Sequence, residues 1–242
     1  QVGGVPSKLA LRRIFAAPDS EQPPVLVTAT LDNENRVQLG LEINEFVTGE
    51  MPVEILITPR TQGEALVQVR ANLVNTELIL EALSWKKAPG RPATLQFEIA
   101  RPSKQRTELQ GFRIVGEDIS LSGSLVLDGR NKLREFSFHE LALHVVSRLQ
   151  LSGTLRNDNV WDVTGRGQTL DGRDFFKSLF SFSQVRSKPL PPRKDQAGLD
   201  MKVEIDNVLG HQEVSLKNLR MQMSNRGGRT IGLHARGTVD SG

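Results

Sequence analysis

The feature that most constrains this chain is an alternation of apolar and polar residues with a period of two, which runs through most of its length. Val25–Leu31, Val37–Ile43, Val53–Ile57 and Val67–Leu73 each place aliphatic side chains on one side of an extended backbone. The same pattern returns in residues 95–99, 119–127, 141–151, 161–165, 199–205, 219–223 and 231–239. Strands of this kind have one apolar and one polar face, so the sequence predicts an all-β chain.

The clearest helix signal lies in residues 170–182. Asp171 is placed to cap a first turn, and Asp174 gives that turn an acidic side chain. The apolar side chains that follow recur three and four residues apart and share one broad helix face. We expect this helix to dock on the sheet through Phe175, Phe176, Leu179 and Phe180. A second short helix is expected near Lys8–Phe15.

These elements leave an imbalance between strands and helices. About a dozen amphipathic strands present an apolar face, and at most two short helices are available to cover it. The face must therefore be closed by the sheet curling on itself, by a second sheet, or by an apolar ligand that is not protein. The residues alone leave a closed β-sandwich or barrel and an open, ligand-lined sheet both possible.

The order of segments predicts three parts. Residues 1–182 are expected to form a curled β-sheet segment that ends in the amphipathic helix. Residues 183–198 contain three prolines and four basic residues within a short stretch and are expected to be an exposed connector. Residues 199–242 begin a further β segment, which we expect to be cut short. The 242 residues suffice for one large β domain or two smaller ones.

Composition argues against several functional classes. The 31 Lys and Arg residues nearly balance 28 Asp and Glu residues and are spread along the chain. Aromatic residues make up 5% and Tyr is absent, so no basic segment carries the stacking platforms of a single-strand nucleic-acid binder. With no Cys, disulfides, thiolate metal sites and Cys nucleophiles are excluded. No apolar run approaches the roughly 18 residues of a membrane span.

Motifs for catalysis are also missing from the sequence. His139 and His144 are five residues apart, which places them on opposite faces of a strand and does not match a zinc-binding helix. There is no phosphate-binding glycine loop and no strained turn that presents a nucleophilic serine. Asp171, Arg173 and Asp174 are explained by capping and charge pairing at a helix start. We therefore expect no enzyme activity, no cofactor and no metal.

Four segments resemble a known family. Arg36–Val53, Ala71–Leu78, Leu83–Gly90 and Leu170–Phe176 are similar, in this order, to the AsmA-like bacterial envelope proteins, and most of all to their YhdP-like branch. The resemblance implies a periplasmic segment of a long protein that is anchored in the inner membrane by parts outside this chain. It also implies a bridge-like lipid-transfer protein, whose twisted sheet forms an open trough that carries phospholipid acyl chains towards the outer membrane.

With this resemblance the expected fold is an elongated, twisted and curled antiparallel sheet with an open β-groove and one or two short helices. The expected partner is phospholipid, with no nucleic acid. The groove is expected to be lined by residues in the apolar phase of their strands: Val37, Leu39, Leu41, Leu95, Phe97, Leu121, Leu125, Val203 and Met221. The alternative is a structural or interaction module, a β-sandwich with a closed protein core.

Overall fold

The computed structural model describes residues 3–11, 22–60, 65–80, 83, 85–144, 146–173, 197–210, 214–227 and 229–240. The chain is all-β, with 73% strand and 4% helix. Thirteen strands are assigned to one long, mostly antiparallel sheet and three short strands to a second. The predicted fold class is therefore confirmed. The four residues expected to dock a helix (Phe175, Phe176, Leu179 and Phe180) and nearly all of the expected connector lie outside the described residues.

The chain divides into two compact units, which are described separately. Unit 1 comprises Gln1–Leu80 and Lys86–Arg134, and unit 2 comprises Glu81–Trp85 and Glu135–Gly242. This division differs from the segments expected from the sequence. Residues 199–242 pair in parallel with the strand that precedes the expected connector, so both lie in unit 2.

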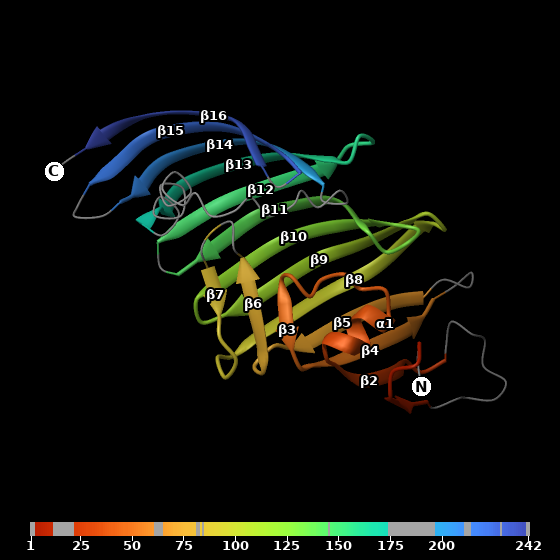
Figure 1. Ribbon diagram of the computed structural model, residues 1–242. Helices are drawn as coiled ribbons and strands as arrows, with labels where there is room; N and C mark the ends of the chain where they lie inside the picture. The colour runs from red at the N-terminus through yellow and green to blue at the C-terminus, as the bar shows by residue number, and fades with distance from the viewer. Residues whose placement is uncertain are drawn as a thin grey trace. The chain divides into compact units, whose positions relative to one another are not determined.

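The main sheet of unit 1 has seven strands in the order β1-β2-β4-β5-β8-β9-β10 (Figure 1). All neighbouring pairs in it are antiparallel. The strands are β1 (Ser7–Ala10), β2 (Val25–Leu31), β4 (Met51–Pro59), β5 (Ala65–Asn72), β8 (Ala93–Ser103), β9 (Arg106–Gly116) and β10 (Ile119–Asp128). Because Ser7–Ala10 form a strand, the helix expected at Lys8–Phe15 is wrong at its start.

The register places the apolar side chains of unit 1 in rows that cross the sheet. One row runs through Ala29, Val53, Ala71, Leu95, Ile114 and Leu121. A second row, four residues away on each strand and five on β9, where the register shifts, runs through Val25, Ile57, Val67, Ile99, Leu109 and Leu125. Each row spans six strands without a polar interruption, so the alternation seen in the sequence becomes one continuous apolar face.

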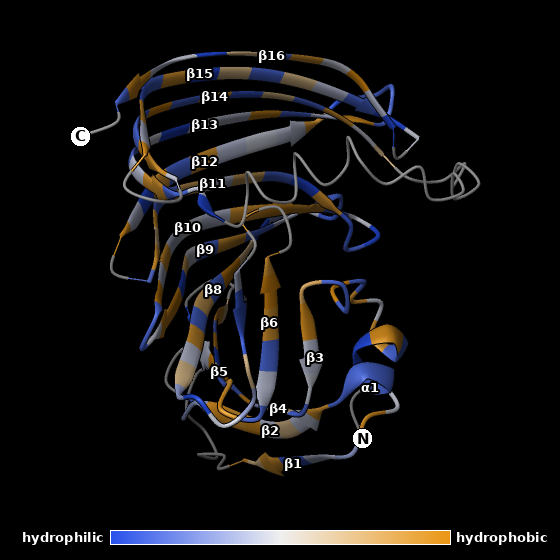
Figure 2. Ribbon diagram, turned by 60° about the vertical axis from the view of Figure 1, so that its left-hand side comes forward, coloured by the Kyte–Doolittle hydropathy of each residue, from blue (hydrophilic) through white to orange (hydrophobic). Residues whose placement is uncertain are grey.

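An inner layer covers part of this sheet. It consists of α1 (Asn33–Gln38), the chain that follows it, and the short strands β3 (Val47–Gly49) and β6 (Thr76–Leu80), with β7 (Trp85–Lys87) next to β6 in the second sheet. Figures 1 and 2 both show α1, β3 and β6 on one side of the β2-β4-β5 part of the main sheet. The second layer that the sequence required is thus partly protein.

The strand expected over Val37–Ile43 is wrong, because α1 extends to Gln38 and residues 39–43 form no strand. Asp32 caps the helix, accepting a hydrogen bond from the Asn35 backbone N–H at 2.8 Å. That bond lowers the pKa of the Asp32 carboxyl. Val37 is 61% exposed on the helix, and Leu39 is its C-cap residue. Val37, Leu39 and Leu41 therefore do not extend the apolar rows as strand residues.

Arg36 fixes the inner layer to the main sheet. Its side chain is fully buried, and it donates to the backbone oxygens of Leu31 (3.0 Å), Gly49 (2.9 Å) and Val47 (3.1 Å). It also donates to the side-chain oxygens of Asn44 (2.8 Å) and Asn33. Burial lowers the pKa of the guanidinium and Asp32 opposes this shift, but an arginine stays charged in either case. A single buried cation therefore joins β2, α1 and β3.

Unit 2 contains six long strands in chain order, β11 to β16. They are β11 (Leu133–Leu143), β12 (Ser147–Leu155), β13 (Val160–Asp171), β14 (Gly198–Leu209), β15 (Ser215–Arg226) and β16 (Arg229–Asp240). The pair β13–β14 is parallel and the other neighbours are antiparallel. Figure 2 shows these strands bowed in the same sense.

Glycines break the apolar rows of unit 2. One row runs through Phe136, Gly153, Val163, Met201, Met223 and Leu233, and the next through Phe138, Leu151, Gly165, Val203, Met221 and Ala235. A Cβ on Gly153 would lie 2.4 Å from the Phe136 ring. The ring therefore fills the space that a larger residue would occupy, and it also packs on Phe138 and Trp161, with ring centres 5.4 and 5.6 Å away.

Candidate functional site

Burial is graded along the apolar face of unit 1. Val53, Val69, Ala71 and Leu121 are only 5–6% exposed, and Leu78 of β6 in the inner layer is equally buried. The row at the other end of the same strands is half-buried at every position. We call this row the apolar strip: Val25, Ile57, Val67, Ile99, Leu109 and Leu125. The strip contains only aliphatic side chains and is incompletely covered in the described part of the chain.

The structure brings together some of the predicted lining residues. Leu95 and Phe97 on β8 lie in the same phase as Leu121 and Leu125 on β10, and Phe97 stacks on Phe112 with ring centres 5.9 Å apart. In unit 2, Val203 and Met221 lie directly opposite each other on β14 and β15. The register thus groups four of these residues in unit 1 and two in unit 2.

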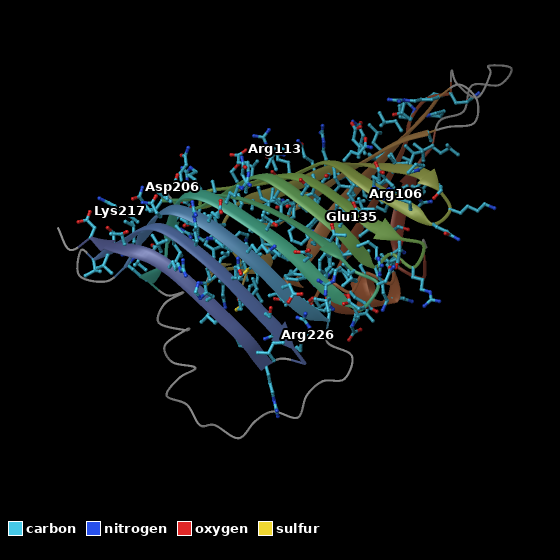
Figure 3. All side chains as sticks on the ribbon, turned by 90° about the horizontal axis from the view of Figure 1, so that it is seen from above. Arg106, Arg113, Glu135, Asp206, Lys217 and Arg226 are labelled. Atoms are coloured by element: carbon cyan, nitrogen blue, oxygen red, sulfur yellow. The ribbon has the colours of Figure 1, made fainter. Side chains whose placement is uncertain are left out.

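Basic side chains gather where the strip reaches the edge of the main sheet. Four strand connections of unit 1 lie at this edge: β1 to β2, most of which lies outside the described residues, β4 to β5, β8 to β9, and the turn after β10. Among the described residues, these connections and the strand ends beside them carry six exposed cations, which we call the basic rim: Arg60, Arg101, Lys104, Arg106, Arg130 and Lys132. Figure 3 shows Arg106 at this end of the strands. Sequence analysis missed the rim because its members are far apart in the chain.

Two rim cations have carboxylate partners and four have none among the described residues. Arg106 pairs with Glu108 at 2.8 Å, and Lys132 lies 3.6 Å from Glu42. Because Glu42 follows α1, this contact places the end of Lys132 beside the inner layer. No ion pair with a described carboxylate holds Arg60, Arg101, Lys104 or Arg130. Glu64, in the β4–β5 connection, lies outside the described residues.

The carboxylates of the rim are already engaged. Hydrogen bonds from Arg106 and Gln110 lower the pKa of Glu108. Burial raises the pKa of Asp128, but the backbone N–H groups of Lys132 and Arg130 donate to its Oδ1 at 3.1 and 2.9 Å and bring the pKa below its usual value. Both groups are therefore ionised at neutral pH, and the rim still carries more positive than negative groups.

Unit 2 also has charged groups at one end of its strands, but they are paired. Arg156 contacts Asp158 at 2.9 Å and Asp200 at 3.1 Å, and Arg226 contacts Asp200 at 2.8 Å. Hydrogen bonds from Arg226 and Ser224 strongly lower the pKa of Asp200. The hydrogen bonds that Arg156 donates to Asp158 in turn raise the pKa of Arg156. These four groups neutralise one another and stand where β13 and β14 begin to pair.

A hollow of about 1260 Å³ lies on the polar side of the unit 1 sheet. Its lining includes the polar-phase residues Thr28, Glu54, Arg70, Thr94 and Gln96. Charges of both signs line it without an aromatic platform, so it specifies no single class of ligand. The hollow is also separate from the apolar strip, whose residues do not line it.

The remaining candidates from the sequence carry no chemistry in the described residues. His139 and His144 are exposed, and no group of three metal-ligating side chains was found in the part of the chain that the structure describes. Asp171 accepts hydrogen bonds from Arg173, and their side chains form a local ion pair. Within the described ranges no helix is long and apolar enough to cross a membrane.

Comparison with known proteins gave no match to a family model, a curated protein or a solved structure. The site must therefore be interpreted from its own geometry.

Proposed function

We propose that this chain binds phospholipid acyl chains on its apolar faces, as a periplasmic segment of an AsmA-like envelope protein that conducts phospholipid between the inner and outer membranes. The observation that carries the proposal is the apolar strip of unit 1. Six aliphatic side chains from six neighbouring strands form one row, and all of them remain half-buried. The family resemblance supports the cellular role, and the strip supports the ligand.

The dimensions of the strip suit an acyl chain. Six strands at a spacing of about 4.8 Å span about 24 Å. An extended acyl chain fills half of a bilayer core of about 30 Å, so the strip is long enough to hold one. Each methylene that leaves water contributes about 0.8 kcal/mol. Such contact has no direction, so binding depends on the whole row and on no single residue.

The inner layer favours a second candidate, a structural or interaction module with a closed protein core. At one end of the unit 1 face, Val53 and Leu78 are as buried as in an ordinary core, at 6% and 5% exposed, although Ala29, Leu95 and Ile114 of the same row are half-buried. The two candidates differ at the other end of the same strands. A lipid-binding chain must admit a ligand at Leu125 and Ile99, whereas a closed module must not.

Photo-crosslinking tests the proposal directly. A photoreactive amino acid is placed at Leu125 or Ile99 in the strip, with Ser122 and Gln96 on the polar phase of the same strands as matched controls. After incubation with phospholipid vesicles, we expect lipid adducts at the two strip positions and none at the two controls. Equal labelling of both phases, or no labelling at any position, would contradict lipid binding on the strip and favour the closed module.

A charge placed in the strip gives an independent test. Leu125→Glu puts an ion among half-buried aliphatic side chains, where water reaches it, so the protein should fold but lose bound lipid. Ser122→Glu adds the same charge to the polar phase of β10, opposite Arg113, and should retain lipid. Native mass spectrometry of the purified proteins measures the bound lipid. Unfolding of Leu125→Glu alone would show that the strip is a closed core.

A further inference from the structure

We propose that the basic rim selects the headgroup of the lipid, so that anionic phospholipids bind in preference to zwitterionic ones. The inference rests on the proposed function, because it assigns a headgroup site to a lipid whose acyl chain lies on the apolar strip. It is carried by a separate observation, the excess of cations without a described carboxylate partner at the edge of the sheet where the half-buried strip ends.

Strand geometry places the rim within reach of a headgroup. Arg101 follows Ile99 by two residues and Arg60 follows Ile57 by three, so these cations lie within about 7–10 Å of the strip along their strands. Arg130 lies in the turn that follows the β10 strand of Leu125, and Lys104 lies at the β8–β9 turn. A headgroup phosphate is joined to the acyl chain through glycerol, which spans this distance. One lipid can therefore contact both features.

The charges of the rim favour a net negative ligand. Six cations face three carboxylates, those of Glu42, Glu108 and Asp128, which leaves an excess of three positive charges. Adding the charged residues of these connections that lie outside the described residues, Arg12, Arg13, Asp19, Glu21 and Glu64, would still leave two. Arginine binds phosphate oxygens through two parallel hydrogen bonds and lysine acts as a point charge, so Arg60, Arg101, Arg130 and Lys104 suit a phosphodiester.

The same charges distinguish two classes of headgroup. A phosphatidylethanolamine headgroup carries an ammonium beside its phosphate, so it has no net charge and brings a cation towards the rim. A phosphatidylglycerol headgroup carries the phosphate charge alone. Because the rim is exposed, each contact contributes little, and the selection must come from several cations acting together. The preference should also weaken as salt shortens the screening distance from about 10 Å at 0.1 M.

The test measures which lipid the full chain extracts. Protein is incubated with vesicles of equal parts phosphatidylglycerol and phosphatidylethanolamine, the vesicles are removed, and native mass spectrometry counts each bound lipid. The rim variant carries Arg60→Gln, Arg101→Gln, Lys104→Gln and Arg130→Gln. The control carries Arg70→Gln, Arg113→Gln, Arg166→Gln and Lys202→Gln, four exposed cations on the polar phase, so both variants lose the same net charge.

We expect the wild type and the control to extract the anionic lipid in about fivefold excess, and the rim variant to extract both lipids within about twofold of each other. Total lipid per protein should be similar in all three. Raising the salt from 50 to 500 mM should reduce the wild-type preference, which gives a second measurement should the rim variant fail to fold.

Each other outcome overturns the inference. A wild type that extracts both lipids equally, or a control that loses the preference as fully as the rim variant, removes headgroup selection and leaves lipid binding intact. A wild type that extracts no lipid, including one that only adheres to vesicles, removes the proposed function and with it the inference.

Discussion

The two units end their apolar rows in different ways, although both are sheets of alternating residues. In unit 2 the strands β12 to β15 carry Arg156, Asp158, Asp200 and Arg226 at or just beyond one of their ends, and each charge there has an opposite partner within 3.1 Å. In unit 1 the apolar strip ends at a rim where four of six cations have no described carboxylate partner. Paired charges hold strands in place, whereas unpaired charges remain available to a ligand. This difference is the reason for proposing a structural role for the first group and a recognition role for the second.

The two units also fill their apolar faces differently. Unit 1 places an inner layer of α1, β3 and β6 over one end of its face, held by the buried Arg36. The rows of unit 2 contain Gly153 and Gly165, and neighbouring side chains fold over them. Unit 1 thus reduces the exposure of its apolar strand surface with a covering layer, and unit 2 does so with glycines over which neighbouring side chains pack.

The largest effect is expected when the inner layer loses its attachment. Arg36→Met leaves the backbone oxygens of Leu31, Val47 and Gly49 without a donor in a buried site. The free energy of unfolding should fall by about 3–5 kcal/mol. Urea unfolding measures this change, with Arg113→Met, an exposed arginine of β9, as the control. A change below about 1 kcal/mol would show that the inner layer is not held by Arg36.

The next effect compares two leucines of the same strand. Leu121 is 6% exposed, whereas Leu125 in the strip is half-buried. Leu121→Ala should cost about 2–4 kcal/mol, since it leaves a cavity in a packed region, and Leu125→Ala about half as much or less. Urea unfolding of the two variants gives the ratio. Equal losses would mean that the strip is packed as tightly as the covered end, and the contrast within unit 1 would fail.

A smaller effect tests how unit 2 fills its face. Gly153→Ala places a Cβ 2.4 Å from the Phe136 ring and 3.2 Å from Val163, so the ring must move. Overpacking of this kind costs about 1–3 kcal/mol. Gly232→Ala on β16 meets only the Ser224 side chain, at 3.9 Å, and is the matched control. Thermal unfolding of both variants measures the difference in stability. Equal stability would show that the packing of the Phe136 ring does not require a glycine at position 153.

The smallest effect concerns the paired charges of unit 2. The folded pKa of Asp200 lies below its unfolded value near 3.8, so its stabilising contribution is present above that pH and is lost as the pH falls through the folded value. Asp200→Asn should therefore lower the melting temperature slightly at pH 7 and flatten its fall below about pH 4 by the same amount, which is small because the pair is partly exposed. Asp206→Asn, on the same strand, is the control (Figure 3). If the melting temperature of all three proteins falls identically with pH, this charge cluster does not contribute to stability.

Most strands could be predicted because alternation is a local property of the sequence. The prediction was wrong where a helix cap competes with the alternation. Val37, Leu39 and Leu41 alternate as strand residues do. However, Asp32 caps a helix that extends to Gln38, and Arg36 of this helix donates to backbone oxygens of β2 and β3. Asp32 followed by the acidic Glu34 was the available signal. Strand β9 was missed because Gly111, at φ +58°, and a register shift in its pairing with β8 near Gln96–Glu98 interrupt its pattern.

The candidate site was predicted only in part. Leu95, Phe97, Leu121 and Leu125 follow from their phase, because phase decides the face of a strand. The difference in burial between Leu121 and Leu125 does not follow from phase, since it depends on an inner layer formed by residues distant in the sequence. The basic rim was out of reach for the same reason. Arg60, Arg101 and Arg130 are brought to the same edge only by the pairing register of the strands, and a single sequence does not supply that register.

The parallel pair in unit 2 has a consequence for how this unit folds. β11 to β13 and β14 to β16 are two antiparallel meanders, each made of neighbours in the chain, so each closes only short loops as it forms. Joining them pairs Val160 with Gly198 and requires a much longer loop to close. Long-range closure slows folding more than it lowers stability. We therefore expect the two meanders to form early and their docking to set the folding rate, so that changes in the β13–β14 seam slow refolding more than equal changes inside either meander.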